Sequence, residues 1–145
     1  MKEVHIYLYS TVKGARSGNG AYTYVLETET NDGPYTKDET VKLHNVSAHK
    51  SVLLALVAAL RRIRKDSYLV IYTDSNYVAS NAKNNLTRWG KNGWKTARGE
   101  PVKHKEEWLE IKQLIARHSF EFVVSSEHSY YQWMKTNAEK AAKCI

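Results

Sequence analysis

The sequence predicts an α/β fold in which helices flank a five-stranded mixed sheet, with three antiparallel strands preceding two parallel ones. The first observation behind this prediction is a change of hydrophobic period, from alternation in the first third of the chain to helical spacing from Ser47. The second is the apolar run YLVIYT (68–73), which follows that helical pattern directly. A strand, a helix and a second strand form a crossover unit, so residues 68–73 should pair in parallel with an earlier strand. The chain length of 145 residues suits one domain, and we treat 1–145 as a single unit.

Three strands are expected at the start of the chain. Apolar residues alternate with polar and aromatic ones over 3–10, which is typical of a strand. Aromatic and β-branched residues fill 21–29, and a weaker alternation over 35–45 predicts an edge strand. The connections VKGARSGNG and NDGP are short and rich in turn residues. Short connections favour an antiparallel meander.

The first helix is expected from Ser47 to Lys65. Ser47 suits the N-cap position, and apolar residues then recur every three or four positions. Several basic residues would lie in the last turn, where cations suit the helix dipole; they are Arg61, Arg62, Arg64 and Lys65. The nearly continuous apolar run that follows, 68–73, predicts a central strand covered on both faces.

The remaining elements complete the order. We expect a short helix over 75–85, a helix over 106–118, a fifth strand over 119–126 and a last helix over about 130–143. The segment 86–105 has neither period.

The net charge of +7 and the pI of about 9.4 suggest a polyanionic partner. Most of this charge lies in one basic protrusion at about 83–105, which holds seven cations and the single acid Glu100. Cations with interleaved tryptophans suit phosphates and bases. The alternative is a solvated basic loop whose tryptophans anchor it to the core. The candidate nucleic-acid-binding residues are Lys83, Arg88, Trp89, Lys91, Trp94, Lys95, Thr96, Arg98 and Lys103.

Cysteine content and hydropathy indicate the compartment. Cys144 is the single cysteine, so neither a disulfide framework nor a cysteine metal site can form. The first ten residues lack a continuous apolar segment, and the longest apolar run, 52–60, is too short to span a bilayer. We therefore expect a cytoplasmic protein without membrane contact.

Asp74 is the acid at the end of the apolar run 68–73. A buried acid is unfavourable unless it has a partner or a role. Asp74 is therefore the first candidate for a catalytic or metal-binding residue.

With TDSNYV around Asp74 and WGKNGWKTARGEPVKHKEEW (89–108), the chain resembles type 1 ribonuclease H over its whole length. The resemblance implies an RNase H-like fold and a basic protrusion that grips a nucleic-acid duplex. It also implies cleavage of the RNA strand of RNA–DNA hybrids by two Mg²⁺ or Mn²⁺ ions in a cluster of four carboxylates.

Aligned with that family, this chain keeps one of the four carboxylates. Asp74 is retained, whereas Tyr9, Val52 and Asn137 stand at the other three positions. Either Glu127 or His128 falls at the position of the family's mobile histidine. The resemblance therefore points to a degenerate active site, as in a pseudoenzyme.

This loss of charge changes the expected chemistry. Two divalent ions about 3.5–4 Å apart need nearby negative charge and hard oxygen ligands. Asp74 supplies one charge, Val52 cannot ligate, Asn137 is neutral, and a tyrosine with an ordinary pKa near 10 is neutral at pH 7. We therefore expect any metal at Asp74 to bind weakly or to be absent.

The main expectation is a protein that binds RNA–DNA hybrid or RNA duplex without efficient cleavage. One alternative is an active or weakly active ribonuclease H with a remodelled site. Another is a non-catalytic interaction module, like the connection subdomain of reverse transcriptases. For that case the candidate partner surface is Tyr130, Tyr131 and Trp133, which otherwise pack over the vacated metal site.

Overall fold

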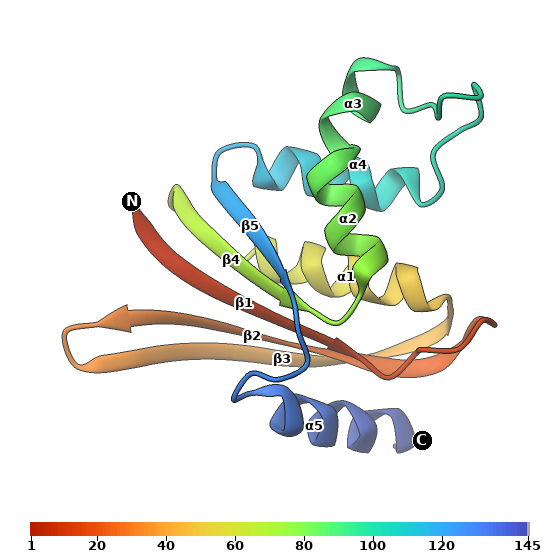
Figure 1. Cartoon of the computed structure of the whole chain (residues 1–145). Coiled ribbons are helices and arrows are strands. Elements are labelled where there is room, and N and C mark those ends of the chain that lie inside the picture. Colours follow the sequence, from red (N-terminus) through yellow and green to blue (C-terminus); the bar gives the residue numbers. More distant parts are fainter. Residues whose placement is uncertain (145) are drawn as a thin grey trace.

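The computed structural model describes residues 1–144 and forms a five-stranded sheet with the order β3-β2-β1-β4-β5 (Figure 1). β1, β2 and β3 are antiparallel neighbours, and β4 is parallel to both β1 and β5. The predicted mixed sheet and its parallel crossover are confirmed. The strands are β1 Lys2–Ser10, β2 Gly18–Thr30, β3 Gly33–Val46, β4 Ser67–Thr73 and β5 Ser119–Val124.

Helices lie on both faces of the sheet. α1 packs on β1 and β2 and against α4, and α5 packs on the other face over β2, β3 and β1 (Figure 1). α2 and α3 lead from the end of β4 to the protrusion. The helices are α1 Ala48–Leu60, α2 Asn76–Asn84, α3 Leu86–Lys91, α4 Lys105–Ile115 and α5 Tyr131–Lys143. Among residues 1–144, no helix is both long and apolar enough to cross a membrane.

The first helix begins as predicted but ends earlier. The Ser47 side chain accepts a hydrogen bond from the Lys50 amide, so the N-cap is confirmed. α1 ends at Leu60 instead of Lys65, because the amides of Arg62 and Ile63 bond to carbonyls only three residues back. The expected placement of four basic residues in the last turn was therefore wrong: they follow the helix, where the chain turns into β4.

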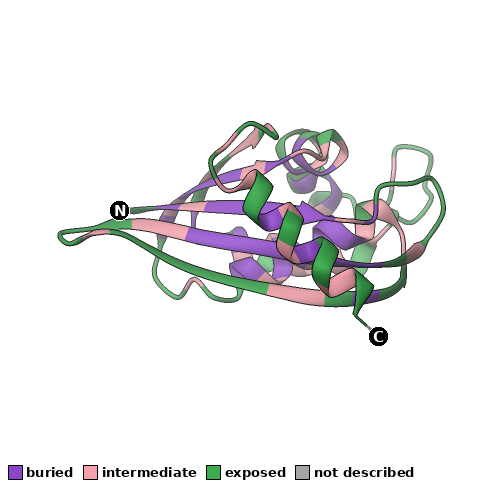
Figure 2. Ribbon diagram, turned by 90° about the horizontal axis from the view of Figure 1, so that it is seen from below, coloured by how far each residue is buried: buried purple, intermediate pink, exposed green. Residues whose placement is uncertain are grey.

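Both faces of the central strands are buried. Ile6 and Leu8 of β1 point toward α1, whereas Tyr7 and Tyr9 point toward α5. Burial is concentrated along the middle of the strands, and the tip of the β2–β3 hairpin is exposed (Figure 2).

Parallel pairing brings the carboxyl ends of β1 and β4 together. β1 and β4 run side by side, so the loop after Ser10 and the acid after Thr73 lie at the same edge of the sheet. The first turn of α1 reaches the same edge, because Ser10 Oγ lies 2.6 Å from Ser51 Oγ.

Candidate functional site

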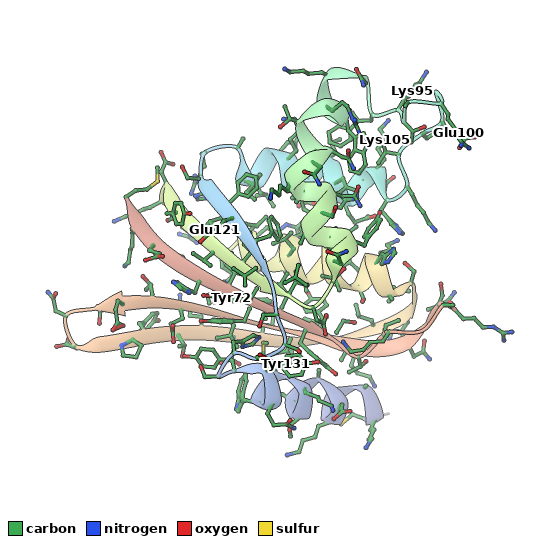
Figure 3. The ribbon with its side chains drawn as sticks, in the orientation of Figure 1. Tyr72, Lys95, Glu100, Lys105, Glu121 and Tyr131 are labelled. Carbon is green, nitrogen blue, oxygen red and sulfur yellow. The ribbon has the colours of Figure 1, made fainter. Side chains whose placement is uncertain are left out.

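Asp74 lies at the carboxyl end of β4 and is held by two side chains. Its Oδ2 lies 2.8 Å from the Lys13 ammonium nitrogen and 3.4 Å from the Tyr131 hydroxyl, which donates to it. Lys13 belongs to the loop after β1. Tyr131 begins α5 (Figure 3). Sequence reasoning missed Lys13, because a loop lysine 61 positions from its partner carries no local signal.

Tyr9 is buried beside this ion pair and cannot substitute for a carboxylate. The Lys13 ammonium lies 4.5 Å from the centre of its ring, and the Tyr131 ring meets it edge-on at 5.3 Å. Burial, together with the nearby Tyr131, Glu139 and Asp74, raises the pKa of Tyr9 to about 12. The phenol is therefore neutral at pH 7 and adds no negative charge.

Val52 and Asn137, the other two residues that the resemblance places at carboxylate positions, also supply no charge. Val52 is 7% exposed and packs in the apolar core between α1 and the sheet. Asn137 lies in α5, where its side-chain amide donates to the Trp133 carbonyl at 2.8 Å. Both residues were named from the sequence. In the structure Val52 packs in the core, and Asn137 bonds to the backbone of its own helix.

The residues at this edge do not fit a pair of divalent ions. Across residues 1–144, no three histidine, cysteine, aspartate or glutamate side chains gather in a way that could hold a metal. Lys13 also places a positive charge on the carboxylate that remains. A divalent ion about 4 Å from that ammonium would be repelled by about 2 kcal/mol at the dielectric of water and about 8 kcal/mol at an effective dielectric of 20.

A cluster of aromatic rings begins at Tyr131, beside Asp74, and continues along the face of the sheet on which α5 packs. Tyr7 and Tyr72 stack with centroids 4.5 Å apart, and the His128 ring lies 4.6 Å from Tyr7. Burial lowers the pKa of His128, so the imidazole is neutral at pH 7. Of the two candidates for the mobile-histidine position, His128 lies in this cluster, whereas Glu127 is exposed.

The structure separates the three aromatic residues considered as a partner surface. Tyr130 packs edge-on against Tyr7 and donates its hydroxyl to Glu27, and Tyr131 packs against Tyr9. Trp133 is the exposed member, at 45%. These three rings therefore do not form a continuous apolar patch, and the alternative of a protein-partner surface at these residues is not supported.

The basic protrusion is anchored by its tryptophans. Trp89 is 8% exposed and meets Trp108 of α4 edge-on at 5.6 Å. Trp94 is half-buried against the same core and donates its backbone N–H to the Trp89 carbonyl at 2.8 Å. Trp89 is therefore a core residue, which corrects our interpretation of it as a nucleic-acid contact.

The polar members of the candidate set lie around this anchor. The basic side chains of the candidate set are exposed, and none of them forms an ion pair with a described carboxylate. Arg88 donates to the Asn85 side chain, and the backbone N–H of Thr96, which is half-buried, donates to the Glu100 carbonyl. The exposed basic residues are Lys83, Arg88, Lys91, Lys95, Arg98 and Lys103.

The protrusion and Asp74 belong to one region of the molecule. α2 begins two residues after Asp74, and its nine residues span about 14 Å before α3 begins (Figure 1). At the start of α1, His49 stacks on Tyr77 of α2 with centroids 3.8 Å apart. Burial and the nearby Lys103 lower the pKa of His49. The start of α1 therefore contacts α2, which begins beside Asp74, and Lys103 of the protrusion lies near this contact.

Comparison with known proteins is consistent with this geometry. A family model for RNase H matches residues 2–143. The chain is 35% identical to a ribonuclease H of Clostridium botulinum over 133 residues, which is 89% of this chain and 86% of that protein. It is 30% identical to a ribonuclease H of Idiomarina loihiensis over 128 residues, covering 88% of this chain and 78% of the relative.

Solved structures share the fold. LC9-RNase H1, a type 1 RNase H with the type 2 active-site motif, superposes with a TM-score of 0.78 at 19% identity, over 98% of this chain and 72% of its own. The RNase H domain of PFV superposes with a TM-score of 0.70 at 18% identity, over 97% of this chain and 93% of its own. The foamy viral protease-reverse transcriptase in complex with an RNA/DNA hybrid gives a TM-score of 0.75 at 16% identity, over 99% of this chain and 20% of its own.

Proposed function

Because the chain belongs to the ribonuclease H family, we propose that it binds RNA–DNA hybrid or RNA duplex through its basic protrusion and cleaves neither efficiently. Residues 1–145 act as one RNase H-like domain in this proposal, and its place of action is the cytoplasm. The observation that carries the absence of efficient cleavage is the ion pair between Lys13 and Asp74 at 2.8 Å.

Binding is supported by the surface of the protrusion. Six exposed lysines and arginines surround an anchored loop, and no described carboxylate neutralises any of them in an ion pair. Phosphate contacts of this kind supply most of the affinity of sequence-independent nucleic-acid binding. We propose RNA–DNA hybrid as a ligand because the chain belongs to the ribonuclease H family. A structural neighbour, the foamy viral protease-reverse transcriptase, is known in complex with an RNA/DNA hybrid.

The absence of efficient cleavage is supported by the site chemistry. Divalent ions, when bound in this family, activate the attacking water and stabilise the leaving oxygen. Here the donor set is Asp74 alone, with a neutral Tyr9 and a lysine ammonium beside it. This chain therefore supplies neither the ligands nor the negative charge for that chemistry, and its residues serve to hold the edge of the sheet together.

The binding test compares neutralised variants by fluorescence anisotropy on labelled RNA–DNA hybrid, RNA duplex and DNA duplex. Lys91→Gln, Lys95→Gln and Arg98→Gln together should weaken binding and reduce the salt slope by about 0.9 for each phosphate that is no longer neutralised. The matched control neutralises three lysines of α5 and should bind like the unmodified chain; these are Lys135, Lys140 and Lys143. Equal weakening in both variants would refute the protrusion as the binding surface.

The cleavage test incubates the same hybrid with the unmodified chain and either Mg²⁺ or Mn²⁺. We expect no cleavage beyond that of a matched Asp74→Asn preparation. Cleavage that depends on Asp74 would instead establish a weakly active enzyme with a remodelled site.

A further inference from the structure

A basic groove of about 600 Å³ lies at the end of the molecule opposite Asp74, where β1 and β4 begin and α1 ends. The β2–β3 hairpin forms one side and the segment 61–65 forms the other, and the hairpin extends past the end of α1 (Figure 1). Val4, Leu26 and Ile63 supply the apolar part of its lining.

The groove holds positive charge that the fold does not neutralise. Of the six cations that line it, Arg61 pairs with Glu110 of α4 and Arg62 donates to the Tyr24 hydroxyl at 3.0 Å. The other four make no ion pair with any carboxylate of residues 1–144; they are Lys2, Lys37, Arg64 and Lys65.

The one acid that lines this groove is already engaged. Glu27 accepts the hydroxyl of Tyr130, which packs on the α5 side of the sheet. Glu27 keeps its negative charge in this hydrogen bond, but the four unpaired cations outnumber it. The groove therefore has a net positive charge, and an anionic ligand suits it.

An exposed aromatic ring lies at the same groove. Lys37 pairs with Leu26 across the hairpin, and Tyr35 pairs with Thr28, so both side chains lie on the face that α1 covers further along. Tyr35 is 54% exposed although it is a large side chain. An aromatic ring beside cations is the arrangement on which bases stack while the backbone phosphates are bound.

We propose that this groove binds a single strand of nucleic acid, with its phosphates on Lys2, Lys37, Arg64 and Lys65 and one base on Tyr35. A single strand is favoured over a duplex because stacking within a duplex covers the base faces that Tyr35 would contact. An acidic peptide would use the cations but would gain nothing specific from the ring. The site is separate from the protrusion and does not rest on the function proposed above.

The experiment uses the full chain with the protrusion neutralised by Lys91→Gln, Lys95→Gln and Arg98→Gln. The probe is a labelled oligothymidine of about 12 nucleotides, within the site sizes of single-strand binding folds. Adding Lys37→Gln and Arg64→Gln should weaken binding about 10-fold at low salt and flatten the salt slope by about 1.4, since each phosphate contact on a single strand contributes about 0.7.

A matched control adds Lys140→Gln and Lys143→Gln, which remove the same charge from α5 and should leave affinity within about 2-fold. Tyr35→Ala should weaken binding about 5-fold or more, because the base no longer has a ring on which to stack. The variants should keep the fold, because every side chain changed in the groove and control variants is exposed; these are Tyr35, Lys37, Arg64, Lys140 and Lys143. Equal weakening in the groove and control variants, no effect of Tyr35→Ala, or equal competition by polyglutamate would each overturn the proposal.

Discussion

Replacing Lys13 with alanine tests the central feature of the Asp74 site. The Lys13 ammonium lies 2.8 Å from Asp74 Oδ2, the oxygen that also accepts the Tyr131 hydroxyl. Removing it should leave Asp74 able to bind Mn²⁺ more tightly than in the unmodified chain. The fold should survive, because a partly exposed ion pair contributes about 0.2–1 kcal/mol and a cation–π contact about as much.

The size of the effect follows from the charges. A divalent ion about 4 Å from an ammonium is repelled by about 2 kcal/mol at the dielectric of water. The two side chains are 47% and 28% exposed, so this lower limit is the appropriate one. A difference of about 2 kcal/mol corresponds to about 30-fold in the dissociation constant.

Manganese titrations followed by electron paramagnetic resonance measure this directly, because the free ion gives the signal that disappears on binding. Lys13→Arg keeps the charge and should bind like the unmodified chain. Lys13→Ala with Asp74→Asn should lose the gain. If Lys13→Ala and the unmodified chain bind Mn²⁺ equally, the ammonium is not the barrier and our account of the site is wrong.

Three further predictions concern the site, the core and the response to pH. Restoring the missing charges and removing the lysine should create magnesium-dependent cleavage of RNA–DNA hybrid, measured on gels; the changes are Tyr9→Asp, Val52→Glu, Asn137→Asp and Lys13→Ala. A folded, hybrid-binding variant that stays inert would contradict the residue correspondence. Trp89→Ala should lower the free energy of unfolding by about 3 kcal/mol in urea titrations, because Trp89 is buried against Trp108; a surface-like effect below about 0.5 kcal/mol would contradict its role as an anchor. Since burial raises the pKa of Tyr9 from 10 to about 12, its neutral form stabilises the fold fully below pH 10, and up to about 3 kcal/mol is lost as pH rises to about 12. Tyr9→Phe should lessen this alkaline loss, and an unchanged slope of stability against pH would count against the shift.

Local patterns in the sequence predicted most of the fold. The alternation in the first strands, the helical spacing after Ser47 and the apolar run 68–73 each reflect which face of an element is buried. The order of these patterns then predicted the parallel crossover between β1 and β4. The end of α1 could not be predicted in this way, because the turn into β4, and not a change in composition, stops the helix at Leu60.

The candidate site was predicted only in part, because contacts between distant segments leave no local pattern in the sequence. Tyr9, Val52 and Asn137 could be named from the chain, because the absence of a carboxylate is a property of the residue itself. Tryptophans among cations, in contrast, look alike in sequence whether they face the core or the solvent, and only packing against Trp108 placed Trp89 inside.

By itself, the sequence determined the order of the main elements, the positive charge of residues 83–105 and the absence of a carboxylate at Tyr9, Val52 and Asn137. The tertiary structure alone decided what Asp74 contacts, which tryptophan is buried and that cations gather in a groove beyond the end of α1. The physical reason is range: periodicity and charge are carried by neighbouring residues, whereas an ion pair between Lys13 and Asp74 exists only once parallel pairing has brought two strand ends together.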